Sequence, residues 1–176
     1  IDGVHPLPGD VPSAMGLERV KALGEMVPLL QRLTPEVFAS YLVTSSSGVA
    51  VLPLATDVLQ ARLLTPGVIG LMFELACAAF DHVAIDMPTG VAPLTAELLE
   101  HAETVVVVSD PTPSGTMRAR YCLEHLRSLQ VPNDAILFCL NRVPERGAIA
   151  TERLERVLGV RISASLPEDP EPVVTA

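Results

Sequence analysis

Apolar residues from position 48 onward fall into two alternating patterns. Short runs rich in Val, Ile and Leu have the length of buried strands and are bounded by turn-forming residues. Between them, apolar residues recur every three or four positions, which is the spacing of one helix face. The strand-like runs are Gly48–Leu54, Phe80–Asp86, Glu103–Asp110, Ala135–Leu140 and a shorter one at Val160–Ala164.

The helical segments carry start and stop signals as well as apolar faces. Thr65-Pro66 is a good pair for an N-cap and first turn, and Gly159 is a typical stop. The first predicted helix buries Val68, Met72, Leu75, Ala76 and Ala79, and the last buries Leu154, Val157 and Leu158. The two between them have faces formed by Leu94, Leu98, Leu99 and Ala102, and by Met117, Tyr121, Cys122, Leu126 and Leu129.

Strands that are apolar on both faces and alternate with amphipathic helices specify a parallel sheet between helices. Because the crossovers are right-handed, the natural arrangement is an open sheet. We therefore predict an α/β fold with a doubly wound, mainly parallel sheet and helices on both faces. No repeat or break in composition divides residues 1–176, which predicts a single domain. In the first third we expect one helix over Ala14–Leu30 and a short one starting at Thr34-Pro35.

Polar residues follow the predicted strands at the edge where a doubly wound sheet binds ligands. Asp86 and Gly90 follow one strand, and Asn141 and Arg142 follow another. A carboxylate at a strand end can hold a Mg²⁺-bound water, and a following Gly lets a backbone N–H approach a phosphate. Asp and Asn also simply favour turns, and this alternative stays open. The polar segment Ser109–Ser114 is best explained as a helix cap.

The segments FDHVAIDMPTG, ETVVVVSDPTPSGTMRA, ILFCLNRV and SLPEDPEPV stand in the order and spacing of the MinD/ParA-type P-loop ATPases, which the chain resembles over Pro35–Ala176. The resemblance implies ATP and Mg²⁺ as cofactors. It places a Mg²⁺- and γ-phosphate-assisting role on Asp86 with Gly90. It also implies adenine recognition by Asn141 with Arg142, and a loop bordering the base at Pro167, Glu168 and Asp169.

The upstream segments GVAVLPLATD and LTPGVIGLMFEL look most like the CpaE/TadZ pilus-assembly branch of this family. That branch places the secretion machinery of tight-adherence pili. The resemblance therefore implies a positioning or assembly ATPase. The protein is expected to be cytoplasmic and homodimeric, with ATP or ADP and pilus or secretion-system proteins as partners.

One element of that family is missing from the sequence. A phosphate-binding loop needs a glycine-rich turn, a Lys and a Ser or Thr, and the chain contains no GxxxxGK[ST]. The only lysine, Lys21, lies in a helical pattern, and Asp2 and Gly9-Asp10 match the family's acidic segment after the loop only weakly. The chain also opens without an initiator Met, so we expect a domain that is incomplete at its N-terminus.

Two functions of different class remain open. One is an ATPase whose loop lies upstream of Ile1, so that the 176-residue chain alone is inactive. The other is a degenerate, non-hydrolysing scaffold of the same fold that acts through protein–protein interaction. A ligase of the same P-loop class is a weaker third, because the sequence leaves little room for a substrate-binding insertion.

Composition further limits the classes of partner that the chain is expected to bind. The formal net charge is −9 and the isoelectric point is near 4.8, which opposes non-specific attraction to nucleic acid or anionic lipid but leaves a local basic patch open. No run approaches the roughly eighteen apolar residues of a membrane span, and we expect no membrane anchor in this chain. The scattered Cys77, Cys122 and Cys139 are predicted to be small buried hydrophobes.

Overall fold

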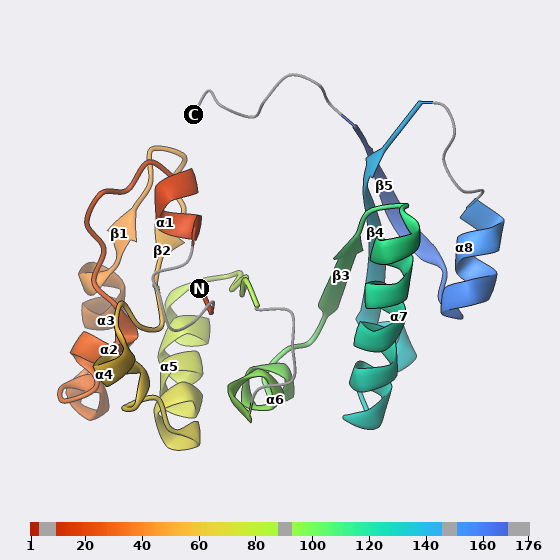
Figure 1. Ribbon diagram of the computed structural model, residues 1–176. Coiled ribbons are helices and arrows are strands. Elements are labelled where there is room, and N and C mark those ends of the chain that lie inside the picture. The colour runs from red at the N-terminus through yellow and green to blue at the C-terminus, as the bar shows by residue number, and fades with distance from the viewer. Residues whose placement is uncertain (4–9, 88–92, 146–150, 169–176) are drawn as a thin grey trace. The chain divides into compact units, whose positions relative to one another are not determined.

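The computed structural model describes residues 1–3, 10–87, 93–145 and 151–168 (Figure 1). The chain divides into two compact units, an amino-terminal unit through His101 and a carboxy-terminal unit from Ala102 onward. Each unit combines helices with strands or parallel-paired segments, and the α/β class is confirmed. The expectation that both units belong to a single domain stays a prediction.

The amino-terminal unit is mostly helical. Its helices are α1 (Asp10–Ala14), α2 (Leu23–Met26), the 3-10 turn η1 (Leu30–Arg32), α3 (Pro35–Tyr41), α4 (Val58–Ala61), α5 (Pro66–Ala79) and α6 (Pro93–Glu100). Two short strands, β1 (Val43–Thr44) and β2 (Ala50–Val51), form an antiparallel pair.

The core of this unit gathers around α5, whose start follows the predicted cap. The Thr65 hydroxyl accepts a hydrogen bond of 3.4 Å from the Val68 N–H, and Pro66 occupies the first turn. Thr34 caps α3 in the same way, as predicted. The predicted face of α5 is buried at Met72, Leu75 and Ala76, and it is widened by Ile69 and Phe73. Against it pack Leu23, Met26, Leu30, Phe38, Leu52, Leu54 and Leu98.

Residues 1–3 lie between two segments that are distant in sequence. Asp2 forms isolated parallel bridges to Pro53 and to Asp86. The Asp2 N–H donates to the Leu52 carbonyl (2.9 Å), and the Leu54 N–H donates back to the Asp2 carbonyl (3.0 Å). Among the described residues, the segments predicted as strands at 48–54 and 80–86 therefore contribute to parallel pairing at Pro53 and at Asp86.

Two predictions for this unit are wrong in detail. The run Gly48–Leu54 is not one parallel strand, because its Ala50–Val51 part pairs antiparallel with β1. The predicted helix Ala14–Leu30 is broken into pieces. Gly16 ends α1 with φ at +68°, a conformation that suits glycine, and Pro28 cannot continue a helix because it lacks an N–H.

The carboxy-terminal unit is a three-stranded parallel sheet with helical crossovers, and the sheet order is β3-β4-β5. Val105 pairs with Ile136 at the start of the first ladder, and Phe138 pairs with Ile162 in the second. Its elements are β3 (Val105–Ser109), α7 (Pro113–Ser128), the 3-10 turn η2 (Asn133–Ala135), β4 (Ile136–Val143), α8 (Thr151–Leu158) and β5 (Ile162–Pro167). The mainly parallel sheet with helical connections is confirmed.

Helix α7 buries a face that shares only Leu126 with the predicted one. Ala119, Leu123 and Leu126 are buried, whereas Met117 and Tyr121 of the predicted stripe are exposed. The cysteine prediction is also wrong, since Cys77 and Cys122 are exposed and Cys139 is half-buried. For α7 and its Cys122 the cause is that the helix carries apolar residues on two sides, and spacing alone does not identify the side that meets β3.

Candidate functional site

The carboxyl end of β4 carries a β-bulge at the predicted base-recognition residues. Leu140 pairs with Ser165 and Val143 pairs with Pro167, so two residues of β4 lie opposite Leu166 alone. The two residues are Asn141 and Arg142. Bulges of this kind bend a strand and redirect its side chains.

The bulge is held by an unusual backbone conformation and a local hydrogen bond. Arg142 has φ at +54°, a left-handed conformation that costs a non-glycine residue about 1–2 kcal/mol. The Asn141 Oδ1 accepts a hydrogen bond of 2.9 Å from the Arg142 N–H. This oxygen retains a second lone pair, and the amide nitrogen offers two donors. Asn141 therefore retains both a hydrogen-bond donor and an acceptor beyond this local bond.

Strand β5 brings the predicted base-bordering loop to the same place. The strand was expected at Val160–Ala164 but runs from Ile162 to Pro167, so Pro167 ends the strand instead of following it. The Glu168 N–H then donates to the Val143 carbonyl over 2.9 Å. The structure therefore brings Asn141, Arg142, Pro167 and Glu168 together, while Asp169 lies outside the described residues.

The predicted metal-side carboxylate belongs to the amino-terminal unit. The Asp86 N–H donates to the Ile1 carbonyl (2.9 Å), and the Gly3 N–H donates to the Asp86 carbonyl (2.8 Å). These bonds set exposed Asp86 beside fully buried Asp2. Asp2 matches the family's acidic segment only weakly in sequence, and its position beside Asp86 makes it a further candidate for the site. Gly90 lies outside the described residues, and one site shared by Asp86 and Asn141 stays a prediction.

The turn after β3 is a helix cap, consistent with the interpretation of Ser109–Ser114. The Thr112 hydroxyl accepts from the Gly115 N–H (3.0 Å) and donates to the Asp110 carboxylate (2.7 Å). A side chain at Gly115 would overlap the Asp110 Oδ1, so glycine is required for this close approach. Local capping accounts for these polar groups.

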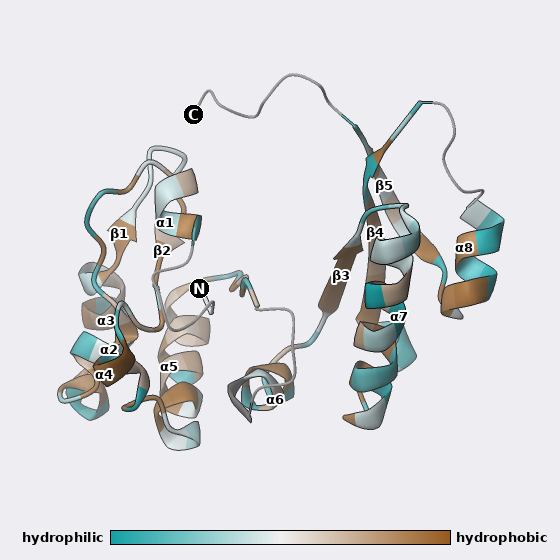
Figure 2. Ribbon diagram, in the orientation of Figure 1, coloured by the Kyte–Doolittle hydropathy of each residue, from teal (hydrophilic) through white to brown (hydrophobic). Residues whose placement is uncertain are grey.

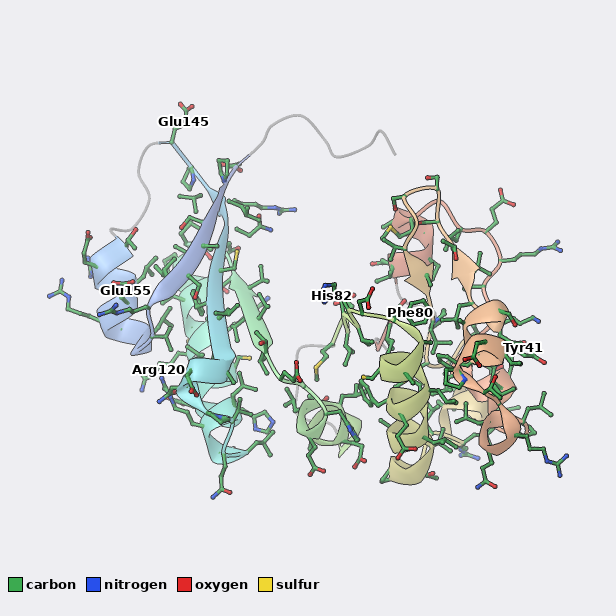
Figure 3. All side chains as sticks on the ribbon, turned by 180° about the vertical axis from the view of Figure 1, so that it is seen from behind. Tyr41, Phe80, His82, Arg120, Glu145 and Glu155 are labelled. Carbon is green, nitrogen blue, oxygen red and sulfur yellow. The ribbon has the colours of Figure 1, made fainter. Side chains whose placement is uncertain are left out.

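A surface hollow of about 420 Å³ lies elsewhere in the carboxy-terminal unit. It is lined by α8 and the residues before β5, including Glu155, Arg156 and Arg161. Figure 3 shows Glu155 on α8, away from Glu145, which follows the carboxyl end of β4. Ligands of doubly wound sheets bind at the carboxyl ends of strands, and we therefore assign the hollow no role. Within the described ranges, no group of three His, Cys, Asp or Glu residues is placed to hold a metal ion.

Comparison with solved structures identifies this arrangement. A ParA family ATPase from Chlorobium tepidum matches 96% of this chain and 70% of its own chain, with a TM-score of 0.85 and 20% sequence identity. The chain has the MinD/ParA fold. The cell division ATPase MinD of Pyrococcus furiosus matches with a TM-score of 0.73 and 24% identity, over 96% of this chain and 69% of its own.

A third structure with the MinD/ParA fold is the septum site-determining protein MinD of Pyrococcus horikoshii, complexed with Mg-ADP. It matches 96% of this chain and 68% of its own, with a TM-score of 0.68 and 20% identity. No protein-family model and no curated protein sequence matches the chain significantly. Among the residues that the structure describes, no helix is long and apolar enough to cross a membrane.

Proposed function

We propose that this chain is part of a nucleotide-binding domain of the MinD/ParA ATPase family, and that it binds the adenine end of ATP. The observation that supports this best is the register of β4 and β5. It sets the bulged Asn141-Arg142 pair beside Pro167 and Glu168 at the carboxyl end of a parallel sheet. Ligands bind at this edge in doubly wound folds.

The chemistry of the donors fits the base. The Asn141 amide offers a donor and a free lone pair to one planar edge, which is the pattern that asparagine uses to bind adenine N6 and N7. Pro167 is rigid and can border the base without moving. Guanine presents an acceptor at O6 where adenine presents a donor, so the same contact discriminates between the two.

The chemistry also fits Mg²⁺ on the carboxylate side. Magnesium prefers oxygen ligands and keeps several of its waters, so an exposed carboxylate such as Asp86 is suited to hold one of those waters. Asp2 adds a second carboxylate on the neighbouring segment. When bound, Mg²⁺ would neutralise charge on the phosphates. The groups that would cradle those phosphates, a glycine-rich loop and its lysine, do not occur in the 176 residues.

A non-hydrolysing scaffold of the same fold is the second candidate, and the missing loop is the observation that favours it. The two candidates differ in the parent reading frame, because an ATPase needs a GKT-type loop before Ile1 and a scaffold does not. A role in positioning a pilus or secretion machine, in the cytoplasm and as a homodimer, belongs to the first candidate. It rests on the upstream segments GVAVLPLATD and LTPGVIGLMFEL.

The base site can be tested on the chain as it stands. We expect adenosine to shift the backbone NMR signals of Asn141, Val143 and Glu168, and guanosine to shift them at least tenfold less at equal concentration. Asn141→Ala should abolish the preference, whereas Asn133→Ala, on the 3-10 turn before β4, should preserve it. Equal shifts with both nucleosides, or shifts confined to other residues, would contradict an adenine site.

A further inference from the structure

The β4–β5 ladder contains a second irregularity, which lies on β5 and comes before the bulge. Phe138 pairs with Ile162, but the next residue of β4, Cys139, pairs with Ala164. Strand β5 therefore has one residue more than β4 across this step, and that residue is Ser163. At the bulge described above it is β4 that has the extra residue. The two irregularities cancel, so the register that precedes the first returns after the second.

The extra residue of β5 is held by its own side chain. The Phe138 N–H donates a hydrogen bond of 3.2 Å to the Ser163 Oγ. A hydroxyl that bonds the backbone in this way competes with the regular pattern of the ladder. The preceding residue is fixed separately, because the Ile162 N–H donates to the Glu155 Oε1 of α8 over 2.9 Å. A change of register that starts at Ser163 would therefore act on the part of β5 that follows it.

Apolar packing specifies the register of this part of β5 weakly. A register is fixed mainly by the apolar side chains that a strand buries. Strand β3 has four consecutive valines and is brown over most of its length in Figure 2. Strand β5 instead has the small residues Ser163, Ala164 and Ser165 between Ile162 and Leu166. These small side chains have little apolar surface to bury, which gives the hydrogen bond at Ser163 more weight.

The extra residue decides which N–H reaches the Val143 carbonyl. In the structure Val143 pairs with Pro167, and its carbonyl accepts from the Glu168 N–H over 2.9 Å. If Ser163 took an ordinary place in the ladder and the bulge of β4 were unchanged, Val143 would pair with Leu166 and its carbonyl would face Pro167. Proline has no N–H to donate. The bond that closes the ladder after the bulge therefore requires the extra residue.

We infer that Ser163 is a positioning residue for the proposed adenine site and acts through the register of β5. Its hydroxyl keeps Pro167 and Glu168 level with the Asn141-Arg142 bulge. A slip of one residue would turn the later side chains of β5 to the opposite face of the sheet, and Pro167 would no longer lie on the side where it borders the base. The effect on adenine binding rests on the proposed function, whereas the alignment can be measured without a ligand.

The test compares Ser163→Val with Ser163→Thr in the 176-residue chain. The two new side chains have nearly the same shape and both suit a strand, but only threonine has a hydroxyl. We expect the valine variant to raise the rate of hydrogen exchange at the Glu168 amide by about tenfold, since the bond to Val143 is lost. The threonine variant should retain the wild-type rate. Ser165→Val, at a regular position of the same ladder, is the matched control and should also retain it.

Two further readouts separate a change of register from a general loosening of the strand. In nuclear Overhauser spectra, Val143 should contact Pro167 in the wild-type chain and in the threonine variant, and Leu166 in the valine variant. Adenosine should shift the Asn141 signals of the wild-type chain and of the threonine variant. The valine variant should lose most of this response, because the residues that border the base are displaced.

Three results would overturn the inference. They are an unchanged Glu168 exchange rate in the valine variant, equal losses in the valine and threonine variants, and a slipped register with an undiminished response to adenosine. A wild-type chain that does not respond to adenosine would instead overturn the adenine site. The exchange rate and the Overhauser contacts would then decide the role of Ser163 in the alignment of β5.

Discussion

The backbone N–H of Glu168 donates to the carbonyl of Val143 over 2.9 Å, one residue beyond the last pair of the β4–β5 ladder. This bond closes the ladder again after the bulge. It fixes the segment after Pro167 to the carboxyl end of β4, so Asn141 and Arg142 are enclosed between paired residues on both sides. The bulge is consequently a fixed feature of the sheet end and not a frayed terminus.

Replacement of Arg142 tests the conformation of the bulge. Glycine tolerates φ at +54°, and a β-branched residue does not. Because Arg142→Gly and Arg142→Val both remove the guanidinium group, their difference reports mainly on the backbone conformation. We expect the valine variant to be less stable than the glycine variant by about 1–2 kcal/mol in urea unfolding. Equal stabilities would mean that the left-handed conformation is absent in solution.

The 176-residue chain should not turn over ATP. Catalysis of phosphoryl transfer is almost entirely positioning and stabilisation of charge, and the loop amides and lysine that supply both do not occur in this sequence. In a coupled assay, the purified chain should release phosphate from ATP no faster than buffer alone. Turnover at rates typical of ATPases, in material freed of contaminants, would place the phosphate site elsewhere in the chain.

If the parent protein carries a phosphate-binding loop, Asp86→Ala should affect mainly the rate of hydrolysis and Asn141→Ala mainly the choice of nucleotide. A carboxylate that holds a metal-bound water matters most as charge develops, so Asp86→Ala should reduce single-turnover hydrolysis far more than ATP affinity. A hydrogen bond to the base acts equally in ground and transition states, so Asn141→Ala should weaken the preference for ATP over GTP. The same pattern of loss in both variants would contradict a division of roles.

Arg127 joins two helices of the carboxy-terminal unit. Its Nη2 donates to the carbonyls of Leu158 (3.3 Å) and Gly159 (3.2 Å), where α8 ends with unpaired carbonyl groups. We expect Arg127→Met to lower the free energy of unfolding by about 1 kcal/mol, since a methionine retains the stem and loses the donors. Arg118→Met, at an exposed position on the same helix, should change it by less than ~0.5 kcal/mol.

Cys122 should react slowly with alkylating reagents. Cys122 is exposed as a residue, but neighbouring protein atoms partly desolvate its thiol and raise the pKa above the ordinary value. Because the thiolate is the nucleophile, a raised pKa leaves less of it at a given pH. The alkylation rate of Cys122 can be measured against pH by mass mapping of the modified peptide. We expect the midpoint of this profile to lie at a higher pH in the folded chain than in the chain unfolded in urea. Coincident profiles would show that folding leaves this thiol in water.

Several elements were predictable from the sequence because their signals are local. Thr65-Pro66 and Thr34-Pro35 mark the starts of α5 and α3, and Gly159 (φ +67°) ends α8. A cap needs only its own backbone, and short-range spacing is enough to find it. Asn141 and Arg142 were expected to follow a strand that ends at Leu140, but they lie within β4, which continues to Val143.

Other features depend on partners that the local sequence does not contain. The segment Phe80–Asp86 is apolar like a strand, but the parallel bridge that the described residues show for it is the one between Asp86 and Asp2. The bulge at Arg142 follows from the register between β4 and β5, which no spacing within β4 reveals. The buried face of α7 is set by its contact with β3. In each case tertiary context overrides a correct local pattern.

The position of Asp2 has a consequence for the order in which the chain folds. Its bridges join residue 2 to residues 53 and 86, while the ladder of β3 and β4 joins residue 105 to residue 136. Distant pairs close larger loops and form more slowly than near ones. Completing the parallel pairing around Asp2 therefore requires closure of the long loop from residue 2 to residue 86. The β3–β4 ladder closes over a much shorter stretch of chain, so it is the better candidate for an early folding unit.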